Sequence, residues 1–436
     1  MKFILFFLNI ILIFSSFFFS NEFLIYNSWS IYFFQFLINL IFLISRIKSL
    51  TNLFMPSFIF LVYLFLGQVV GGYLSPLGYG WYGDFDKALS LVNNMHIIVF
   101  YNLIINYILF YLTGIFLFKN NNYKINYLNS YNYYISFFLV ILIFVIVSFV
   151  RGVWTFPIQL GSFIILYLMS LNKNLFLRVA SILFMFFIMI TTSYDSKREI
   201  IMVLVAFLII TLLYKKYSLN LRTILLAPLA FLIFSLTIML SSILRGYGDL
   251  DNRSFLSALT YIPIYIKSEN FLDNLVENFE LNYSYSLPVL AMEYVLNGRI
   301  DFQYGLSLIK PIFLIIPRDL FDLKPESIIF TFTKAYDYNF YQNGGSLPVL
   351  LPAELFINFN LFGILIFFLI IYYLNNIYRK IFYTQNTFYF IQYILISSLF
   401  LMFMRGSGFD LFILYIVLGS FYIYLMCIFL KIKMDK

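Results

Sequence analysis

Charged residues are scarce in this sequence, and that scarcity sets its class. Only 11% of the residues are charged and 62% are hydrophobic, with a mean hydropathy of +0.91. Soluble domains carry about a quarter charged residues. We therefore expect a protein that lies in a lipid bilayer, and the long apolar runs predict an all-α chain.

Residues that commonly build redox and metal sites are almost absent. Cys427 is the single cysteine and lies in an apolar run, which excludes a disulfide framework and a thiolate metal site. His96 is the single histidine, which excludes a histidine-rich metal cluster, and we interpret it as a structural helix residue. The sequence also has no Walker-type phosphate loop, no Ser-x-Gly elbow and no zinc-ligand spacing. These absences argue against an ATP-driven pump and a metalloprotease.

Long apolar runs, in contrast, fill most of the chain. A membrane-spanning helix needs about 20 largely apolar residues. Lys2 precedes the first run as in a signal peptide, but Phe18 and Ser20 make a poor cleavage site, so we expect a retained helix. The sequence predicts twelve spans, near residues 3–20, 30–45, 53–72, 95–118, 132–150, 153–171, 175–192, 199–214, 223–243, 350–374, 386–404 and 409–430.

The distribution of lysine and arginine predicts the orientation. With both termini in the cytoplasm, the cytoplasmic segments hold 15 basic residues and one acid, whereas the other side holds 13 basic and 19 acidic residues. This asymmetry follows the positive-inside rule. The net charge of +8 is therefore explained by topology, and we expect no nucleic-acid partner.

One connection carries most of the residues on the outer side. Residues 1–436 are expected to form a single transmembrane domain, with a large periplasmic loop at 244–349 between the ninth and tenth helices. Loops of this length are usually functional. Helical periodicity within it predicts short helices near 255–266, 284–296 and 306–316, and the last is apolar but too short to span, so it should lie along the membrane surface.

Arginines on the outer side are unexpected under the positive-inside rule and require a reason. A guanidinium group binds phosphate with two parallel hydrogen bonds and stays charged at low dielectric. If they converged, the arginines would form a diphosphate pocket; alternatively, each ends a helix or pairs with an acid such as Asp195, Asp249 or Asp410. The five are Arg151, Arg198, Arg245, Arg318 and Arg405.

Glu354 and Asn358 stand four residues apart at the start of the tenth predicted span, so they share a helix face. Gly363 follows and permits close helix approach. A partly desolvated carboxylate at the membrane edge suits general-base catalysis, and ionisable residues within a membrane suggest function. Alternatively, Glu354 neutralises an arginine or stabilises its own helix N-terminus.

Two Asp-x-Asp pairs offer a different chemistry. Asp84 with Asp86, and Asp249 with Asp251, could hold a divalent metal as in some membrane glycosyltransferases. Such short pairs arise easily by chance in polar loops, so we expect no metal.

The segment IPRDLFDLKPES, followed by GGSLP and then AELFINFNLFG, resembles the outer loop and following helix of bacterial oligosaccharide repeat-unit polymerases, the Wzy-type O-antigen polymerases. The resemblance covers about residues 310–363, is weaker in SYDSKREIIMVL at 193–204, and elsewhere rests on topology. The related O-antigen ligases carry a histidine-containing motif where Glu354 stands here, which favours a polymerase.

The resemblance implies substrates and roles. The substrate would be an undecaprenyl-diphosphate-linked oligosaccharide at the periplasmic face of the bacterial inner membrane. The reaction would need no cofactor or metal. A protein that regulates chain length is a possible partner. Glu354, or alternatively Asp319, would activate the acceptor hydroxyl, while Asn358 and Gly345 would support the site. The diphosphate would be bound chiefly by Arg318, Arg198 and Arg245, with Arg151, Arg405 and Lys324 as further candidates.

Two other functions remain open. A ligase, or another membrane glycosyltransferase that uses a lipid-phosphate sugar, would need similar groups. A flippase for lipid-linked sugars would also suit twelve helices, but flippases usually have short loops and charges deep within their helices. Helices interrupted by central Gly or Pro are also scarce here, with Pro157 and Pro228 as the nearest candidates.

Overall fold

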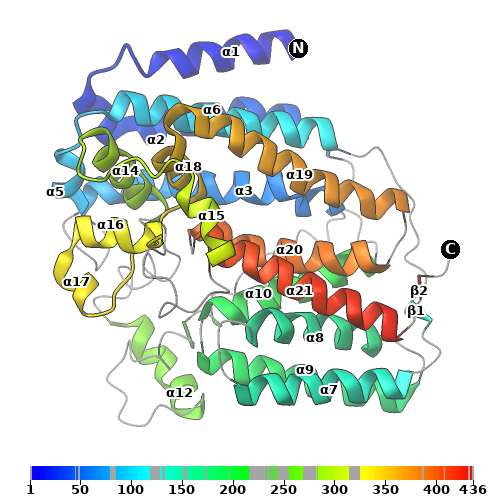
Figure 1. Ribbon diagram of the computed structural model, residues 1–436. Helices are drawn as coiled ribbons and strands as arrows, with labels where there is room; N and C mark the ends of the chain where they lie inside the picture. Colours follow the sequence, from blue (N-terminus) through cyan, green and yellow to red (C-terminus); the bar gives the residue numbers. More distant parts are fainter. Residues whose placement is uncertain are drawn as a thin grey trace.

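A computed structural model gives the arrangement of the helices (Figure 1). The structure describes residues 2–44, 46–47, 50–78, 85–117, 128–129, 133–150, 155–171, 174–195, 197–215, 255–268, 281, 283–313, 325–384, 387–406, 408–430 and 433–434, with a few isolated positions between 232 and 243. Nearly all of these residues are helical, as the composition predicts.

The longer helices form a bundle in which they run alongside one another (Figure 1). Five stretches of the described chain are long and apolar enough to cross a membrane: Asn21–Leu43, Pro56–Leu77, Met95–Phe116, Leu351–Lys380 and Leu411–Ile428. The helices of the bundle are α1 (Lys2–Ser15), α2 (Asn21–Ile44), α3 (Pro56–Phe65), α6 (Met95–Phe116), α7 (Tyr133–Val150), α8 (Thr155–Ser170), α9 (Leu175–Asp195), α10 (Lys197–Lys215), α19 (Gly363–Thr384), α20 (Thr387–Arg405) and α21 (Phe409–Leu430).

Eleven of the twelve predicted spans coincide with helices of this bundle, and the twelfth, at 223–243, lies largely outside the described residues. The helical nature of these segments is therefore confirmed. The number of membrane crossings stays a prediction, because several of the helices are shorter than a full span.

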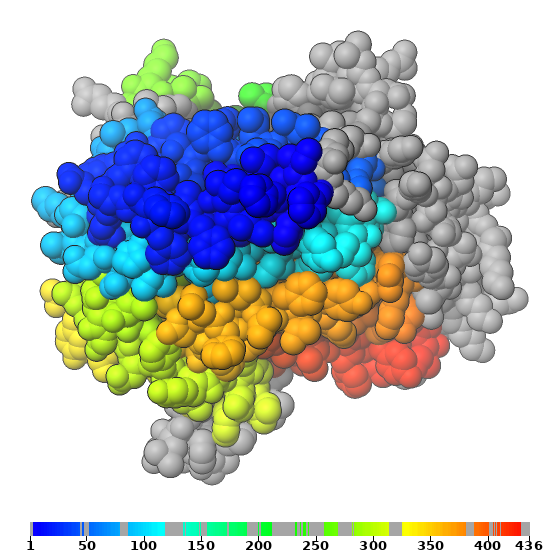
Figure 2. Space-filling model, turned by 90° about the horizontal axis from the view of Figure 1, so that it is seen from above, coloured from blue at the N-terminus to red at the C-terminus, as the bar shows by residue number. Residues whose placement is uncertain are grey.

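The surface of the bundle is apolar where a soluble protein would be polar. On α7, Phe138, Leu142 and Ile146 are exposed at four-residue spacing, while Val140 and Phe144 are buried on the other face. A helix that is hydrophobic all round is typical of a membrane environment. Figure 2 shows α1 on the outside of the bundle, where its large apolar side chains form part of the surface.

Short elements gather at one end of the bundle, and both termini lie near the other end (Figure 1). The antiparallel pair of β1 (Leu128–Asn129) and β2 (Lys433–Met434) lies at the end of the bundle where the C-terminus is found (Figure 1). At the opposite end lie α5 (Phe85–Ser90), α12 (Phe255–Ile266), α14 (Tyr283–Leu296), α16 (Ile328–Tyr336) and α17 (Tyr338–Gln342). Four of these five belong to the predicted outer loop; the side of the membrane on which they lie stays a prediction.

The remaining short elements connect or interrupt the long helices. Among the described residues they are η1 (Leu50–Phe54), the π-helix η2 (Leu66–Gly71), α4 (Gly72–Leu74), η3 (Ser75–Leu77), α15 (Leu306–Phe313), α18 (Leu351–Phe359) and η5 (Asn360–Phe362). The predicted loop helices at 255–266 and 284–296 match α12 and α14, and the described part of the third, at 306–316, matches α15.

Polar side chains join the helices inside the bundle. Ser57 of α3 accepts hydrogen bonds from Thr113 of α6 at 2.8 Å and from Asn375 of α19 at 2.9 Å. Asn106 of α6 donates to Gln68 of η2 at 2.7 Å. Such bonds hold transmembrane helices together, because lipid offers no competing partner.

Candidate functional site

The predicted helix at 350–374 is not continuous. The short helix α18 ends at Phe359. The next residue, Asn360, has a φ of 53° and a ψ of −137°, and η5 then leads into α19 at Gly363. A Cβ atom at Gly363 would lie 2.7 Å from the Leu355 carbonyl oxygen, so glycine lets α19 begin close against α18. The expectation of a single unbroken helix is thus wrong. The break makes α18 a separate short helix, and its residues 351–358 are buried inside the protein.

Glu354 lies at the centre of a buried hydrogen-bond cluster and is only 2% exposed. One carboxylate oxygen, Oε1, accepts from the Ser307 hydroxyl at 2.7 Å, and the other, Oε2, accepts from the backbone N–H of Phe409 at 3.2 Å. The cluster therefore joins three elements that are distant in sequence: α15, α18 and the start of α21.

Asn358 supports the same cluster from the next turn of α18. Its side-chain N–H donates to Ser307 Oγ at 2.8 Å and to the Glu354 carbonyl oxygen at 2.7 Å. Its Oδ1 accepts from the Gly305 N–H at 3.0 Å. The prediction that Glu354 and Asn358 share one helix face is confirmed, and Asn358 fixes the orientation of Ser307 towards the carboxylate.

The helix α15 has its polar face inside and its apolar face outside. Ser307 and Lys310, one turn apart, are buried, with Lys310 only 7% exposed. Leu306, Ile309 and Ile312 are exposed on the other side, Ile312 to 66%. This inverted pattern suits a short helix that packs against α21 with lipid on its outer face.

Strained backbone surrounds this cluster. Among the described residues, Tyr304 (φ 47°) and Asn360 (φ 53°) are the two non-glycine residues with positive φ, and both flank it. Gly406, between α20 and α21, has a φ of 87°, and its Cβ would meet the Val349 carbonyl oxygen at 2.0 Å. Such strain collects at functional sites, where the surrounding structure holds it in place.

Most of the predicted diphosphate ligands lie outside the described residues. These are Arg151, Arg245, Arg318 and Lys324, and the alternative base Asp319 lies outside as well. Arg198 falls in the first turn of α10 and Arg405 at the last residue of α20, two helices that pack against each other, but their side chains are also outside the described set. The convergence of the arginines stays a prediction.

Other predicted residues have structural contacts. Gly345 follows α17, and its N–H donates to the Phe340 carbonyl oxygen at 2.9 Å; a Cβ there would meet the Phe340 ring at 2.5 Å, which gives Gly345 a packing role. The His96 ring packs on Phe17. Of the four aspartates in Asp-x-Asp pairs, only Asp86 is described, and the described residues form no group of three metal-ligating side chains.

Sequence reasoning did not single out Ser307, the buried position of Lys310, or Glu293. Glu293 of α14 is a second buried carboxylate, and it accepts from the backbone N–H groups of Asn93 at 2.8 Å and Asn94 at 3.1 Å, and from Asn297 Nδ2 at 2.7 Å. It therefore anchors the N-terminus of α6 to α14. The sequence did carry a signal for Lys310 and Glu293, because each is the single charged residue of an apolar segment, LSLIKPIF and PVLAMEYVL respectively.

Comparison of the chain with family models, with curated proteins and with solved structures finds no match in any of the three sets.

Proposed function

We propose that this chain is a membrane glycosyltransferase that polymerises undecaprenyl-diphosphate-linked oligosaccharide repeat units at the periplasmic face of the bacterial inner membrane. The family resemblance over residues 310–363 suggests this reaction. The observation that carries it is the Glu354 cluster, because a buried carboxylate with oriented partners stands in the most similar segment.

The reaction assigns one proton-transfer role to Glu354. The oxygen of an acceptor sugar hydroxyl attacks the anomeric carbon of the donor, and its proton passes to the Glu354 carboxylate. The bond between that carbon and the diphosphate oxygen breaks, and undecaprenyl diphosphate leaves with the electron pair.

The partners of Glu354 would position its carboxylate for proton transfer. Ser307 and the Phe409 N–H hold both oxygens, and Asn358 holds Ser307. Such preorganisation aligns the carboxylate with the acceptor before reaction. In the same proposal, Arg318, Arg198 and Arg245 bind the diphosphate and stabilise the charge that develops on the leaving group.

A lipid-linked oligosaccharide transporter is the second candidate, and the break between α18 and α19 favours it. Discontinuous membrane helices with polar groups near the break are typical of transporter binding sites. The Glu354 cluster would then recognise cargo without reacting with it. An O-antigen ligase remains the nearest enzymatic alternative, since it uses the same donor.

A complementation experiment separates these functions. The gene is deleted in its bacterial host and restored as wild type, Glu354→Gln or Arg318→Ala, and the surface glycan is resolved by size. A polymerase predicts that deletion reduces the ladder to a single repeat unit on its anchor, and that both variants fail to restore it. If deletion also removes the single unit while lipid-linked precursor accumulates, the chain is a ligase or a transporter, and the proposed polymerase function is wrong.

A further inference from the structure

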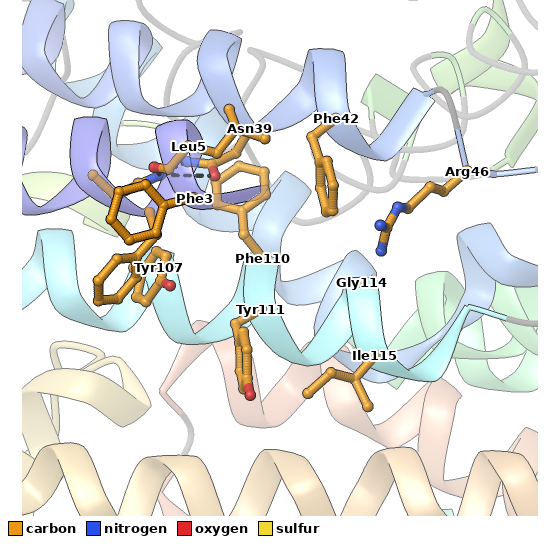
Figure 3. A pocket seen from close by; sticks show the side chains of 12 residues that line it. Phe3, Leu5, Asn39, Phe42, Arg46, Tyr107, Phe110, Tyr111, Gly114 and Ile115 are labelled. Carbon is orange, nitrogen blue, oxygen red and sulfur yellow. Dashed lines mark hydrogen bonds between the residues drawn. The ribbon is translucent and has the colours of Figure 1, made fainter. Parts of the chain in front are cut away.

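A groove lies between α1, α2 and α6, away from the Glu354 cluster. Its volume is about 670 Å³, within the range of about 300 to 1,000 Å³ that is usual for ligand pockets. Figure 3 shows the side chains that line it, from Phe3 and Leu5 of α1 to Tyr111 and Ile115 of α6. The lining is mostly aromatic and aliphatic, so an apolar ligand fits most of its length.

Amide side chains on one wall of the groove, and one behind it, bond to one another. Asn9 and Asn39 exchange two hydrogen bonds, at 3.0 Å and 2.8 Å, drawn as dashed lines in Figure 3. Gln35 donates to the Asn9 side chain at 3.3 Å and to the Leu103 carbonyl oxygen at 2.8 Å. These amides join α1 to α2 and α6, and their side-chain N–H groups bond within the protein.

Arg46 stands at one end of the groove, in the turn that follows α2. Its guanidinium carbon lies 3.9 Å from the centroid of the Phe42 ring, and Figure 3 shows it extending towards α6 near Gly114. Among the described residues, no carboxylate forms an ion pair with Arg46. A guanidinium group on an aromatic face at the mouth of an apolar groove is well placed to bind a phosphate.

The described segments that form this end of the groove, the end of α2 with the turn after it and the end of α6, carry no acid. Residues 40–56 contain Arg46 and Lys48 and no Asp or Glu, and the described end of α6, residues 107–117, contains no charged residue. This end thus attracts anions. It also lies on the side that the lysine and arginine distribution places in the cytoplasm, where anionic lipids are enriched.

We propose that this groove is a binding site for an anionic phospholipid, with an acyl chain between α1 and α6 and the headgroup phosphate on Arg46. The lipid would complete the packing of α1, which otherwise contacts the bundle along a narrow strip and leaves Phe3 and Phe7 exposed. The site is independent of the glycosyltransferase proposal, because it shares no residue with the Glu354 cluster.

Native mass spectrometry of the purified full chain tests the site, with phosphatidylglycerol and phosphatidylcholine added in parallel. Wild type should bind the first phosphatidylglycerol more tightly than phosphatidylcholine. Arg46→Gln should weaken phosphatidylglycerol binding by about tenfold and remove the preference, since a hydrogen bond to a charged group commonly contributes that much. Arg379→Gln is the matched control, because Arg379 also lies over an aromatic ring, that of Phe116, but does not line the groove.

Gly114→Leu tests the acyl-chain part of the site. A Cβ at Gly114 has Phe42 Cε1 at 3.5 Å as its nearest contact, so a leucine side chain would extend into the groove and weaken binding of both lipids. If that variant does not fold, as judged by gel filtration, Arg46→Gln decides alone. Equal affinity of wild type for the two lipids, or wild-type behaviour of Arg46→Gln, overturns the proposal. A change in oligomeric mass with unchanged lipid binding assigns the groove to a second copy of the chain and overturns it as well.

Discussion

Two buried carboxylates show how similar residues serve different purposes. Glu293 accepts from backbone and amide donors at a helix N-terminus, whereas Glu354 accepts from a hydroxyl group and a backbone N–H. Both are 2% exposed, so burial alone does not distinguish them. The strained backbone and the family resemblance at Glu354 point to function there, and the helix cap at Glu293 points to stability.

Glu354→Gln should abolish the proposed transfer while the protein still folds. Glutamine keeps the size of the side chain and can accept from either Ser307 or Phe409, but it cannot take a proton from the acceptor. Loss of a general base commonly slows a reaction about a hundredfold or more. The measurement is the rate of glycan transfer in membranes with a lipid-linked donor. Glu293→Gln is the matched control and should keep the wild-type rate per folded molecule.

Glu293→Ala should lower the stability of the protein and leave the proposed transfer rate per folded molecule unchanged. The substitution leaves the Asn93 and Asn94 N–H groups without their acceptor in a partly buried position. Each such loss costs about 1–3 kcal/mol. Thermal unfolding in detergent measures the change, and a melting temperature equal to that of wild type would contradict the anchoring role of this residue.

At the scale of elements, the turn between α20 and α21 positions the Glu354 cluster. Phe409, which donates to Glu354, follows Gly406 and Gly408, and both glycines have positive φ. The backbone N–H of Val349, just before α18, donates to the Gly406 carbonyl oxygen at 3.3 Å. The start of α18 and the start of α21 are therefore held together by backbone contacts that leave no room for a side chain.

Gly406→Ala should destabilise the protein more than Gly344→Ala does. Both glycines have positive φ, 87° and 78°, which costs a non-glycine residue about 1–2 kcal/mol. A Cβ at Gly344 meets nothing within 4 Å, whereas one at Gly406 would lie 2.0 Å from a backbone oxygen. Thermal unfolding of the two variants isolates the steric part, and equal losses of stability would show that the turn can shift.

The sequence predicts the elements well and their interruptions poorly. Apolar runs of about 20 residues locate helices because hydropathy alone selects them. The break at Asn360 depends instead on how Gly363 packs on the Leu355 carbonyl group, and hydropathy carries no signal for that. The bond from Ser307 to Glu354 spans 47 residues of chain, so spacing within one helix reveals Asn358 as a partner but not Ser307.

At the scale of the whole molecule, the short loop helices lie at one end of the bundle and the termini at the other (Figure 1). The lysine and arginine distribution predicts that the acids collect on the side of the long loop, and this sorting stays a prediction. A chain with one chemically distinct end is suited to a substrate that is presented at one face of a membrane. The sidedness itself rests on the lysine and arginine distribution.

Cysteine labelling in intact cells should reveal opposite exposure of the two ends. Cys427→Ser first removes the single native thiol, which lies in α21. Asn339→Cys on α17 should then react with an impermeant maleimide from outside the inner membrane, because Asn339 is exposed in the predicted periplasmic loop. Asn174→Cys, exposed before α9 beside the predicted cytoplasmic Arg178, should react only after permeabilisation. If Asn174→Cys is labelled from outside, the orientation is opposite to the predicted one, and the substrate of the Glu354 cluster would then have to be cytoplasmic.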